Sequence, residues 1–290
     1  MKVSEEYREI LQELVDVVQA LGVYREDVVL IGGLVPLLYR FHPEYKVPRQ
    51  AALLTGDLDL SVPPHLALRG DRTLRRLLDE SGFVVLESRG DRPGIPPKHY
   101  FQKRSRGEER LAPIHGEFLT PLSGSETDRT GKPKSPTEFQ KGLTAEALRY
   151  LDLLRWEPMK MNLSKIDGLM APKGLEIRIP RPGAYMIQKA LCSRKRSPLE
   201  KRDKDLAYIF DVVVISRSNW EEVSQEIREI GKVGPLWSGW LDKARGTLQD
   251  AFLSDAGDGP EVVARIYQHD KLQAANVRRV MRQFMETVGW

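Results

Sequence analysis

The hydrophobic pattern of the first 122 residues alternates between helical and strand-like periods. Residues 4–21 repeat apolar side chains at helical spacing up to Gly22, and the short apolar run 28–31 predicts a buried strand. Further along, the pattern predicts helices over 34–41 and 72–81, and strands over 54–62, 83–86, 98–103 and 111–119. This order indicates a small mixed sheet backed by helices.

The pattern changes after residue 122. Residues 121–142 are rich in Ser, Thr, Gly, Pro and Lys, which predicts a mobile loop or linker. Helical signals resume over 144–154, and two strand-like runs follow at 156–163 and 175–179. After Pro182 the expected elements are all helices, over 183–194, 199–216, 219–230, 236–254, 260–269 and 273–288.

Together these patterns predict an α+β (mixed α/β) fold with two domains. A small mixed-sheet core occupies residues 1–122, a mobile loop or linker 123–142, and a mainly helical domain 143–290. The two strands within 156–179 could form a hairpin added to the first sheet.

Composition places the chain among ordinary globular proteins. Of its 290 residues, 41% are hydrophobic and 30% charged. No apolar run approaches the roughly 18 residues that span a bilayer, and the N-terminus does not read as a secretory signal. The single cysteine, Cys192, excludes an intrachain disulfide and a cysteine-based zinc site. We therefore expect a cytoplasmic protein without membrane contact.

The net charge of +4 is modest, but its distribution is uneven. Residues 194–204 carry six cations. Such a cluster is either a solvated surface or a contact for an anionic partner, such as nucleotide phosphates or RNA. These cations are Arg194, Lys195, Arg196, Lys201, Arg202 and Lys204.

Two aspartates interrupt the apolar strand over 54–62. Strand alternation places Asp57 and Asp59 on one face, and Leu58 and Leu60 on the other. Like charges side by side are unfavourable unless a cation lies between them. One aspartate at the surface and the other capping a turn is the simpler alternative. Oxygen ligands of this kind favour a divalent metal, most plausibly Mg²⁺.

A third acid and a glycine pair complete the candidate site. Glu117 interrupts the strand that ends near Pro121, so it could converge with Asp57 and Asp59 if the two strands are neighbours. Three carboxylates can hold two divalent ions about 3.5–4 Å apart. Gly32 and Gly33 follow a buried strand and precede a helix, where backbone amides can approach a triphosphate closely. A tight turn alone would also need these glycines.

This arrangement resembles the nucleotidyltransferase fold of the DNA polymerase β superfamily. The resemblance is carried by a Gly-Gly turn after an apolar strand, the Thr55-x-Asp57-x-Asp59 strand, and a later strand with a single acid. With the basic helices that follow Pro182, residues 28–210 also resemble stand-alone bacterial nucleotidyltransferases, including toxin-type members related to abortive-infection proteins. Relatives commonly carry Gly-Ser where this chain has Gly32-Gly33.

The resemblance implies a reaction and roles for residues. An NMP would pass from an NTP (ATP among the candidates) to a hydroxyl, with Mg²⁺ or Mn²⁺ held by Asp57, Asp59 and Glu117. Gly32, Gly33 and Thr55 would contact the nucleotide, as would the cations of the helical half. Asp205 would orient a lysine or act in catalysis. Those cations are Lys189, Arg194, Lys201 and Lys204.

The acceptor is open on sequence grounds. A tRNA 3′ end is the first expectation and a protein side chain (AMPylation) the second, and a cognate antitoxin protein is a further possible partner. A catalytically inactive module that binds nucleotide or RNA is an alternative from a different class. The basic second half does not suggest the acidic pocket that transfer to an aminoglycoside would need.

Overall fold

The chain is described here from a computed structural model. It describes residues 3, 5–46, 48, 51–53, 55–88, 97–103, 115–127, 129–131 and 134–290. The chain forms two compact units. The first contains Met1–Val35 and Leu54–Pro180, and the second contains Pro36–Leu53 and Arg181–Trp290. The mixed α/β fold expected from the sequence is confirmed.

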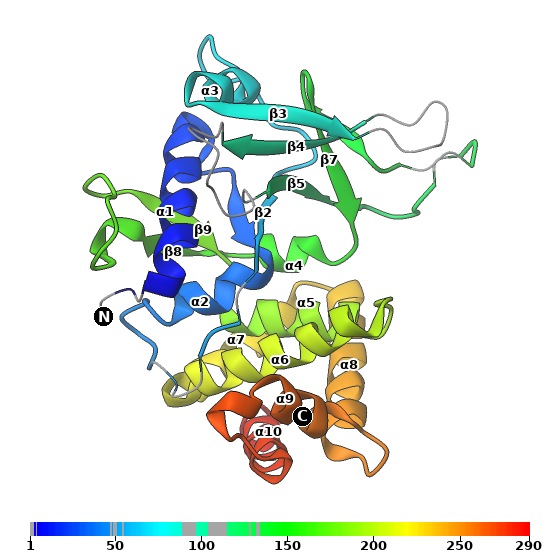
Figure 1. Ribbon diagram of the computed structural model, residues 1–290. Helices are drawn as coiled ribbons and strands as arrows, with labels where there is room; N and C mark the ends of the chain where they lie inside the picture. The colour runs from blue at the N-terminus through cyan, green and yellow to red at the C-terminus, as the bar shows by residue number, and fades with distance from the viewer. Residues whose placement is uncertain are drawn as a thin grey trace. The chain divides into compact units, whose positions relative to one another are not determined.

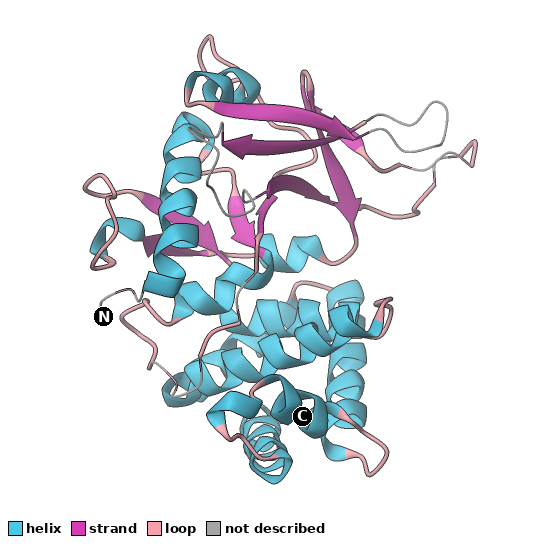
Figure 2. Cartoon of the chain, in the orientation of Figure 1, coloured by secondary structure: helices cyan, strands magenta, loops and turns pink. Residues whose placement is uncertain are grey.

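The first unit is built on one mixed sheet, which is magenta in Figure 2. Its main path runs β3-β4-β5-β2-β1-β9-β8, and β7 pairs with β5 and with β6 beside this path. β1 and β2 are antiparallel, whereas β2 and β5 are parallel. The strands are β1 (Val29–Ile31), β2 (Asp57–Ser61), β3 (Phe83–Ser88), β4 (Lys98–Lys103), β5 (His115–Pro121), β6 (Thr137–Gln140), β7 (Leu143–Leu148), β8 (Met159–Asn162) and β9 (Glu176–Ile179).

Three helices accompany this sheet (Figure 1). They are α1 (Glu5–Ala20), α3 (Leu74–Glu80) and α4 (Leu151–Arg155). α1 is tied to β4 by an ion pair between Asp16 and Lys103. Thr73 caps α3, because its side chain accepts a hydrogen bond from the backbone N–H of Arg76.

One face of the sheet is filled by phenylalanines. The rings of Phe101 and Phe118 lie 5.0 Å apart between centroids, and Phe118 and Phe139 lie 5.2 Å apart. Gly116 makes room for this row, because a Cβ there would lie 2.0 Å from the Phe101 ring. With this face closed by apolar packing, the polar residues that alternate with it project from the opposite face.

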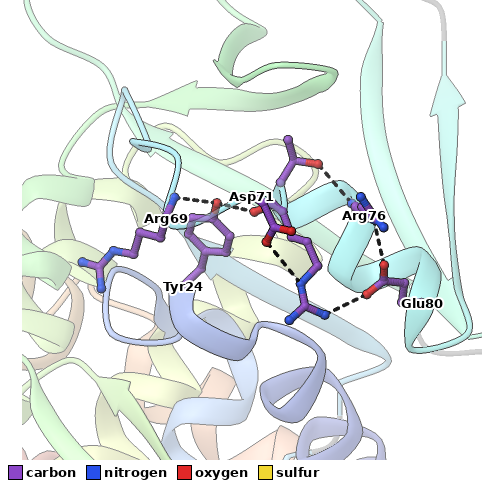
Figure 3. Close-up of polar contacts among 7 residues, drawn as sticks. Tyr24, Arg69, Asp71, Arg76 and Glu80 are labelled. Carbon is purple, nitrogen blue, oxygen red and sulfur yellow. Dashed lines mark hydrogen bonds and ion pairs between the residues drawn. The ribbon is translucent and has the colours of Figure 1, made fainter.

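A polar cluster fixes the chain between β2 and α3. The Tyr24 hydroxyl accepts a hydrogen bond from the Arg69 backbone N–H at 3.0 Å and donates to the Arg72 carbonyl at 2.7 Å (Figure 3). Arg76 pairs with Glu80 one helical turn away, at 2.8 Å. The arginines of this segment are therefore paired within the unit.

The second unit is helical. Its first long helix, Pro182–Ser193, is buried along nearly its whole length, whereas helices such as Trp220–Lys232 and Ala274–Val288 bury one side and expose the other. The long helices of this unit are α5 (Pro182–Ser193), α6 (Leu199–Ile215), α7 (Trp220–Lys232), α8 (Pro235–Leu248), α9 (Gly259–Ile266) and α10 (Ala274–Val288). The π-helical turn Gln249–Leu253 follows α8. α2 (Val35–Tyr39) leads from the first unit into the second.

The segment 36–53 joins the second unit through a buried ion pair. Arg40 donates to both carboxylate oxygens of Asp211, at 2.7 and 2.9 Å, and the two side chains are 4% and 0% exposed. The ring of Tyr39 packs edge-on against Tyr185 of α5. A stretch that the sequence pattern assigns to the first domain therefore packs with the helices.

The prediction of a helix over 144–154 is wrong. Residues 143–148 form β7, and only Leu151–Arg155 is helical. Leu, Ala and Glu in residues 143–148 are good helix formers, but this stretch pairs with β6 over 143–145 and with β5 over 146–148, and this pairing overrides the local preference. The stretch 123–142, expected as a loop, carries β6 near its end.

The other elements fall close to the predicted ranges. The two strands within 156–179 pair as β8 and β9, and β9 extends the sheet beside β1. Residues 104–114, which include the predicted turn and the beginning of one predicted strand, lie outside the described residues, as does Leu54.

Candidate active site

The candidate site lies on the polar face of the sheet, where β2 runs parallel to β5. The register places Asp59 beside Glu117 and Asp57 beside His115. Cross-strand neighbours on one face are typically about 5 Å apart at Cβ. The Asp59 and Glu117 side chains are hydrogen-bonded to each other, an arrangement that favours a shared proton between the two carboxyls.

This contact perturbs the acidity of Glu117. Burial, the neighbouring charge of Asp59 and the hydrogen bond between them, in that order, raise the pKa of Glu117 to about 7. Glu146 acts in the same direction, whereas Lys98 opposes the shift. A carboxyl with a pKa near neutrality is suited to accept a proton at physiological pH.

The glycine turn after β1 abuts this acid pair. Gly32 has a φ of +76°, and a Cβ placed on it would lie 1.9 Å from Oδ2 of Asp59. Only glycine is compatible with both the left-handed backbone and this close approach. Gly33, the next residue, is buried in the same turn. The backbone of the Gly-Gly turn therefore lies directly against the carboxylate of Asp59.

The remaining residues expected on this strand lie further out. Asp57 is exposed, and its backbone N–H is 3.4 Å from the hydroxyl of Thr55. Among the described residues, no three His, Cys, Asp or Glu side chains are gathered as a metal-binding group. The structure thus brings Asp59 and Glu117 together but does not close a three-carboxylate cluster with Asp57.

β4 and β7 contribute residues that the sequence analysis did not single out. Tyr100 lies directly beside Glu117 in the register of β4 and β5. Lys98 pairs with Glu146 of β7 at 2.5 Å. Glu146 was missed because residues 144–154 were expected to be helical. Alternation within β4 places Lys98 and Tyr100 on one face of the strand, but it does not show that this face borders Glu117.

Within the helical unit, Lys189 and Asp205 form a buried pair. Lys189 donates to Oδ1 of Asp205 at 2.9 Å, and Arg196 donates to Oδ2 at 3.0 Å. The Lys189 ammonium also lies 5.6 and 5.4 Å from the ring centroids of Tyr185 and Tyr208. Aromatic contacts and two cations on one carboxylate offset the cost of burying these charges.

The other expected phosphate contacts are at the surface of the same unit. Arg194, Lys201 and Lys204 are exposed. They make no ion pair with any described residue, unlike Arg202, which pairs with Asp258. An exposed, unpaired cation keeps its charge available to an anionic ligand.

Comparison with known proteins identifies the family of the chain. A protein-family model described as "Nucleotidyltransferase" matches residues 9–230, well over half of the chain. The chain therefore belongs to a nucleotidyltransferase family.

The chain is also similar to a solved structure, an antigenic nucleotidyltransferase-like protein from Paracoccidioides brasiliensis. The two share 16% sequence identity, the match covers 83% of this chain and 94% of the other, and the TM-score is 0.39. No curated protein matches the chain. Within the described residues, no helix has the length and apolar character needed to traverse a membrane.

Proposed function

We propose that this protein is a metal-dependent nucleotidyltransferase of the DNA polymerase β type. It transfers an NMP from an NTP to a hydroxyl and releases pyrophosphate. The observation that supports this most is the hydrogen-bonded pair of Asp59 and Glu117, held against the Gly32 turn. Two acids in contact on a half-buried face are costly unless a cation joins them in the working state.

The donor set fits Mg²⁺ or Mn²⁺. Asp59 and Glu117 offer hard carboxylate oxygens on neighbouring strands, and exposed Asp57 lies one pleat further along β2. In this proposal Asp59 and Glu117 would hold the metal, and Asp57, which is not gathered with them among the described residues, would join as a third ligand. The bound metal would stabilise the developing negative charge on the transferred phosphoryl group. The Gly32-Gly33 turn and Thr55 contact the triphosphate.

Glu117 accepts the proton of the acceptor hydroxyl. As that O–H bond breaks, the oxygen forms a bond to the α-phosphorus, and the bond from the α-phosphorus to the bridging oxygen of the β-phosphate breaks. Pyrophosphate leaves with that electron pair. Glu117 is suited to this role because its carboxylate lies on the polar face of the sheet beside Asp59, within the proposed site.

The helical unit is proposed to supply positive charge for the phosphates. Exposed Arg194, Lys201 and Lys204 are suited to direct contact. Lys189 is buried and already paired, so it is suited to hold Asp205 in place. For the acceptor, a tRNA 3′ end stays our first proposal and a protein side chain the second. Action as a cytoplasmic toxin with a cognate antitoxin belongs to the same proposal.

The experiment is transfer of label from a mixture of [α-³²P]NTPs, with Mg²⁺, to total RNA or to cell lysate. Wild-type protein should label an acceptor, and Asp57→Ala combined with Asp59→Ala should abolish labelling. Asp79→Ala, an exposed aspartate of α3, is the matched control and should keep full activity. Equal labelling by the double variant would refute the metal-site assignment. Nucleotide binding without any transfer would favour a binding module.

A further inference from the structure

The order of strands gives the candidate site a direction. Along the sheet, β1, β2, β5 and β4 are consecutive neighbours. Ile31, which precedes the Gly32 turn, lies beside Asp59; Asp59 lies beside Glu117; and Glu117 lies beside Tyr100. One row across the polar face therefore runs from the glycine turn, through the two acids, to a tyrosine.

The chemistry of the proposed reaction uses this direction. In phosphoryl transfer the attacking and leaving oxygens lie roughly in line, on opposite sides of the phosphorus. If the Gly32 turn holds the triphosphate, the leaving pyrophosphate lies on the β1 side of the acids. The attacking hydroxyl then arrives from the opposite side of Glu117, which is the side of β4.

The residues on that side form a surface with an aromatic ring and a polar pair. Tyr100 is half-buried on the face of Glu117. Lys98 precedes it on the same face and is held by Glu146, with side chains 41% and 32% exposed. The Lys98 charge also interacts with Tyr100 and Glu117. These three residues thus border Glu117 opposite Asp59 and remain accessible to solvent.

We propose that Tyr100, with the Lys98–Glu146 pair, forms the acceptor subsite, and that the acceptor hydroxyl belongs to a sugar ring. This inference rests on the proposed function. The Tyr100 ring stacks against the sugar or its attached base, and the polar pair hydrogen-bonds to neighbouring hydroxyls. An aromatic face next to the proton-accepting carboxylate suits a flat ring better than the flexible side chain of a serine or threonine.

The test measures transfer from [α-³²P]NTPs to three separate acceptor pools. The pools are purified total RNA, a mixture of free ribonucleosides and aminoglycosides, and an RNA-depleted protein extract. We expect label in the first or the second pool, and which of the two is labelled identifies the source of the sugar. Label in the protein pool alone would overturn the proposal.

Variants of β4 then test the subsite with whichever pool is labelled. Tyr100→Ala should raise the KM for acceptor about fivefold or more, because base–aromatic stacking is worth about 1–3 kcal/mol. The KM for NTP should stay within about twofold of the wild-type value. Tyr100→Leu keeps the apolar bulk of the strand and should show the same split if Tyr100→Ala fails to fold.

Two controls make the outcome specific. Tyr100→Phe keeps the ring and should bind acceptor as the wild type does. Gln102→Ala changes the next residue on the same face of β4, beside Val84 and one pleat away from Glu117, and should change neither KM. An unchanged KM for acceptor in Tyr100→Ala and Tyr100→Leu would overturn the subsite and leave the proposed function standing. Absence of transfer by the wild type to all three pools would overturn both.

Discussion

At the scale of single residues, the site depends on the absence of a Cβ at Gly32. Other glycines of the chain also have a positive φ, but Gly32 lies against Asp59: a Cβ there would lie 1.9 Å from Oδ2 of that side chain. Asp59 would have to leave the position in which it meets Glu117. The glycine therefore serves the acid pair as well as the turn.

Gly32→Ala should abolish nucleotidyl transfer and lower the thermal stability of the protein. Gly70→Ala is the matched control, since Gly70 has a φ of +71° with open space around its Cβ position. That control should cost only the left-handed strain, about 1–2 kcal/mol, and keep its activity. Transfer assays and thermal unfolding of both variants measure the difference. Similar activity in the two variants would contradict the role given to Gly32.

Glu117 is suited to the proposed reaction, but its ionisation lowers the stability of the folded protein. Its pKa is raised to about 7 from the usual 4.5, chiefly by burial and then by Asp59. The unfolded chain releases this proton near pH 4.5 and the folded chain only near pH 7, so ionisation costs stability above that range. Glu117→Gln removes the cost.

We expect Glu117→Gln to abolish transfer and to stabilise the metal-free protein at pH 8. The full shift corresponds to about 3 kcal/mol, and screening at a partly solvated site reduces the expected gain to about 1 kcal/mol. Urea unfolding at pH 8 and pH 4 tests this, because the gain should vanish below the unfolded pKa of 4.5. A loss of stability at pH 8 would show that Glu117 is held by favourable contacts instead.

At the scale of secondary structure, the sequence pattern predicted several boundaries closely. β4, in which buried and half-buried residues alternate, matches the expected 98–103. α6 differs from the expected 199–216 by one residue at its end, although it is buried on nearly all sides from Asp205 onward. β7 was missed although its residues, Leu-Thr-Ala-Glu-Ala-Leu, alternate in polarity. Leu, Ala and Glu are strong helix formers, and the pairing with β6 and β5 that makes this stretch a strand overrides that local preference.

Some residues of the candidate site could be predicted from the sequence pattern, and others could not. Strand alternation predicts Asp57 and Asp59 on one face, and convergence with Glu117 if the two strands are neighbours. β2 and β5 are neighbours, and their register places Asp59, but not Asp57, beside Glu117. Tyr100 and Glu146 could not be assigned, since nothing in the sequence states that β4 and β7 both border β5 on the side away from β2. Strand order is a long-range property that the local pattern does not encode.

The beginning of α5 offers a test at the same scale. Glu226 of α7 is buried and accepts hydrogen bonds from the backbone N–H groups of Gly183 and Ala184, at 3.1 and 2.8 Å. It satisfies amides that have no partner within their own helix. Burial nevertheless raises the pKa of Glu226 to about 7.

Stability should therefore fall as pH rises from 4.5 to 7, since the unfolded chain loses the Glu226 proton first. We expect the unfolding free energy of the wild type, relative to Glu226→Gln, to drop by about 3 kcal/mol over this interval. Glu221→Gln, at an exposed position on α7, is the control and should follow the wild type. Parallel pH profiles for the wild type and Glu226→Gln would contradict this assignment.

At the scale of the whole molecule, the two units do not follow a single cut in the chain. The segment Pro36–Leu53 leaves the first unit and joins the helices through Arg40 and Asp211 before the chain returns to β2. Asp211→Ala leaves Arg40 buried without its carboxylate and should cost about 3–5 kcal/mol. Arg40→Met combined with Asp211→Leu should recover most of that loss. Chemical unfolding of Asp211→Ala and of the double variant measures both changes in stability. If Asp211→Ala is as stable as the wild type, this ion pair does not anchor the segment to the helices.

The site that contains Asp59 and Glu117 is proposed to catalyse transfer of a nucleotide, and not of a terminal phosphate. Parallel reactions with [α-³²P]NTP and [γ-³²P]NTP test this directly, using wild-type protein and Asp59→Asn with Mg²⁺. We expect the wild type to place the α-label in the acceptor and the γ-label in pyrophosphate. Asp59→Asn should produce neither labelled acceptor nor labelled pyrophosphate. Entry of the γ-label into the acceptor, or undiminished α-labelling by Asp59→Asn, would contradict the proposal.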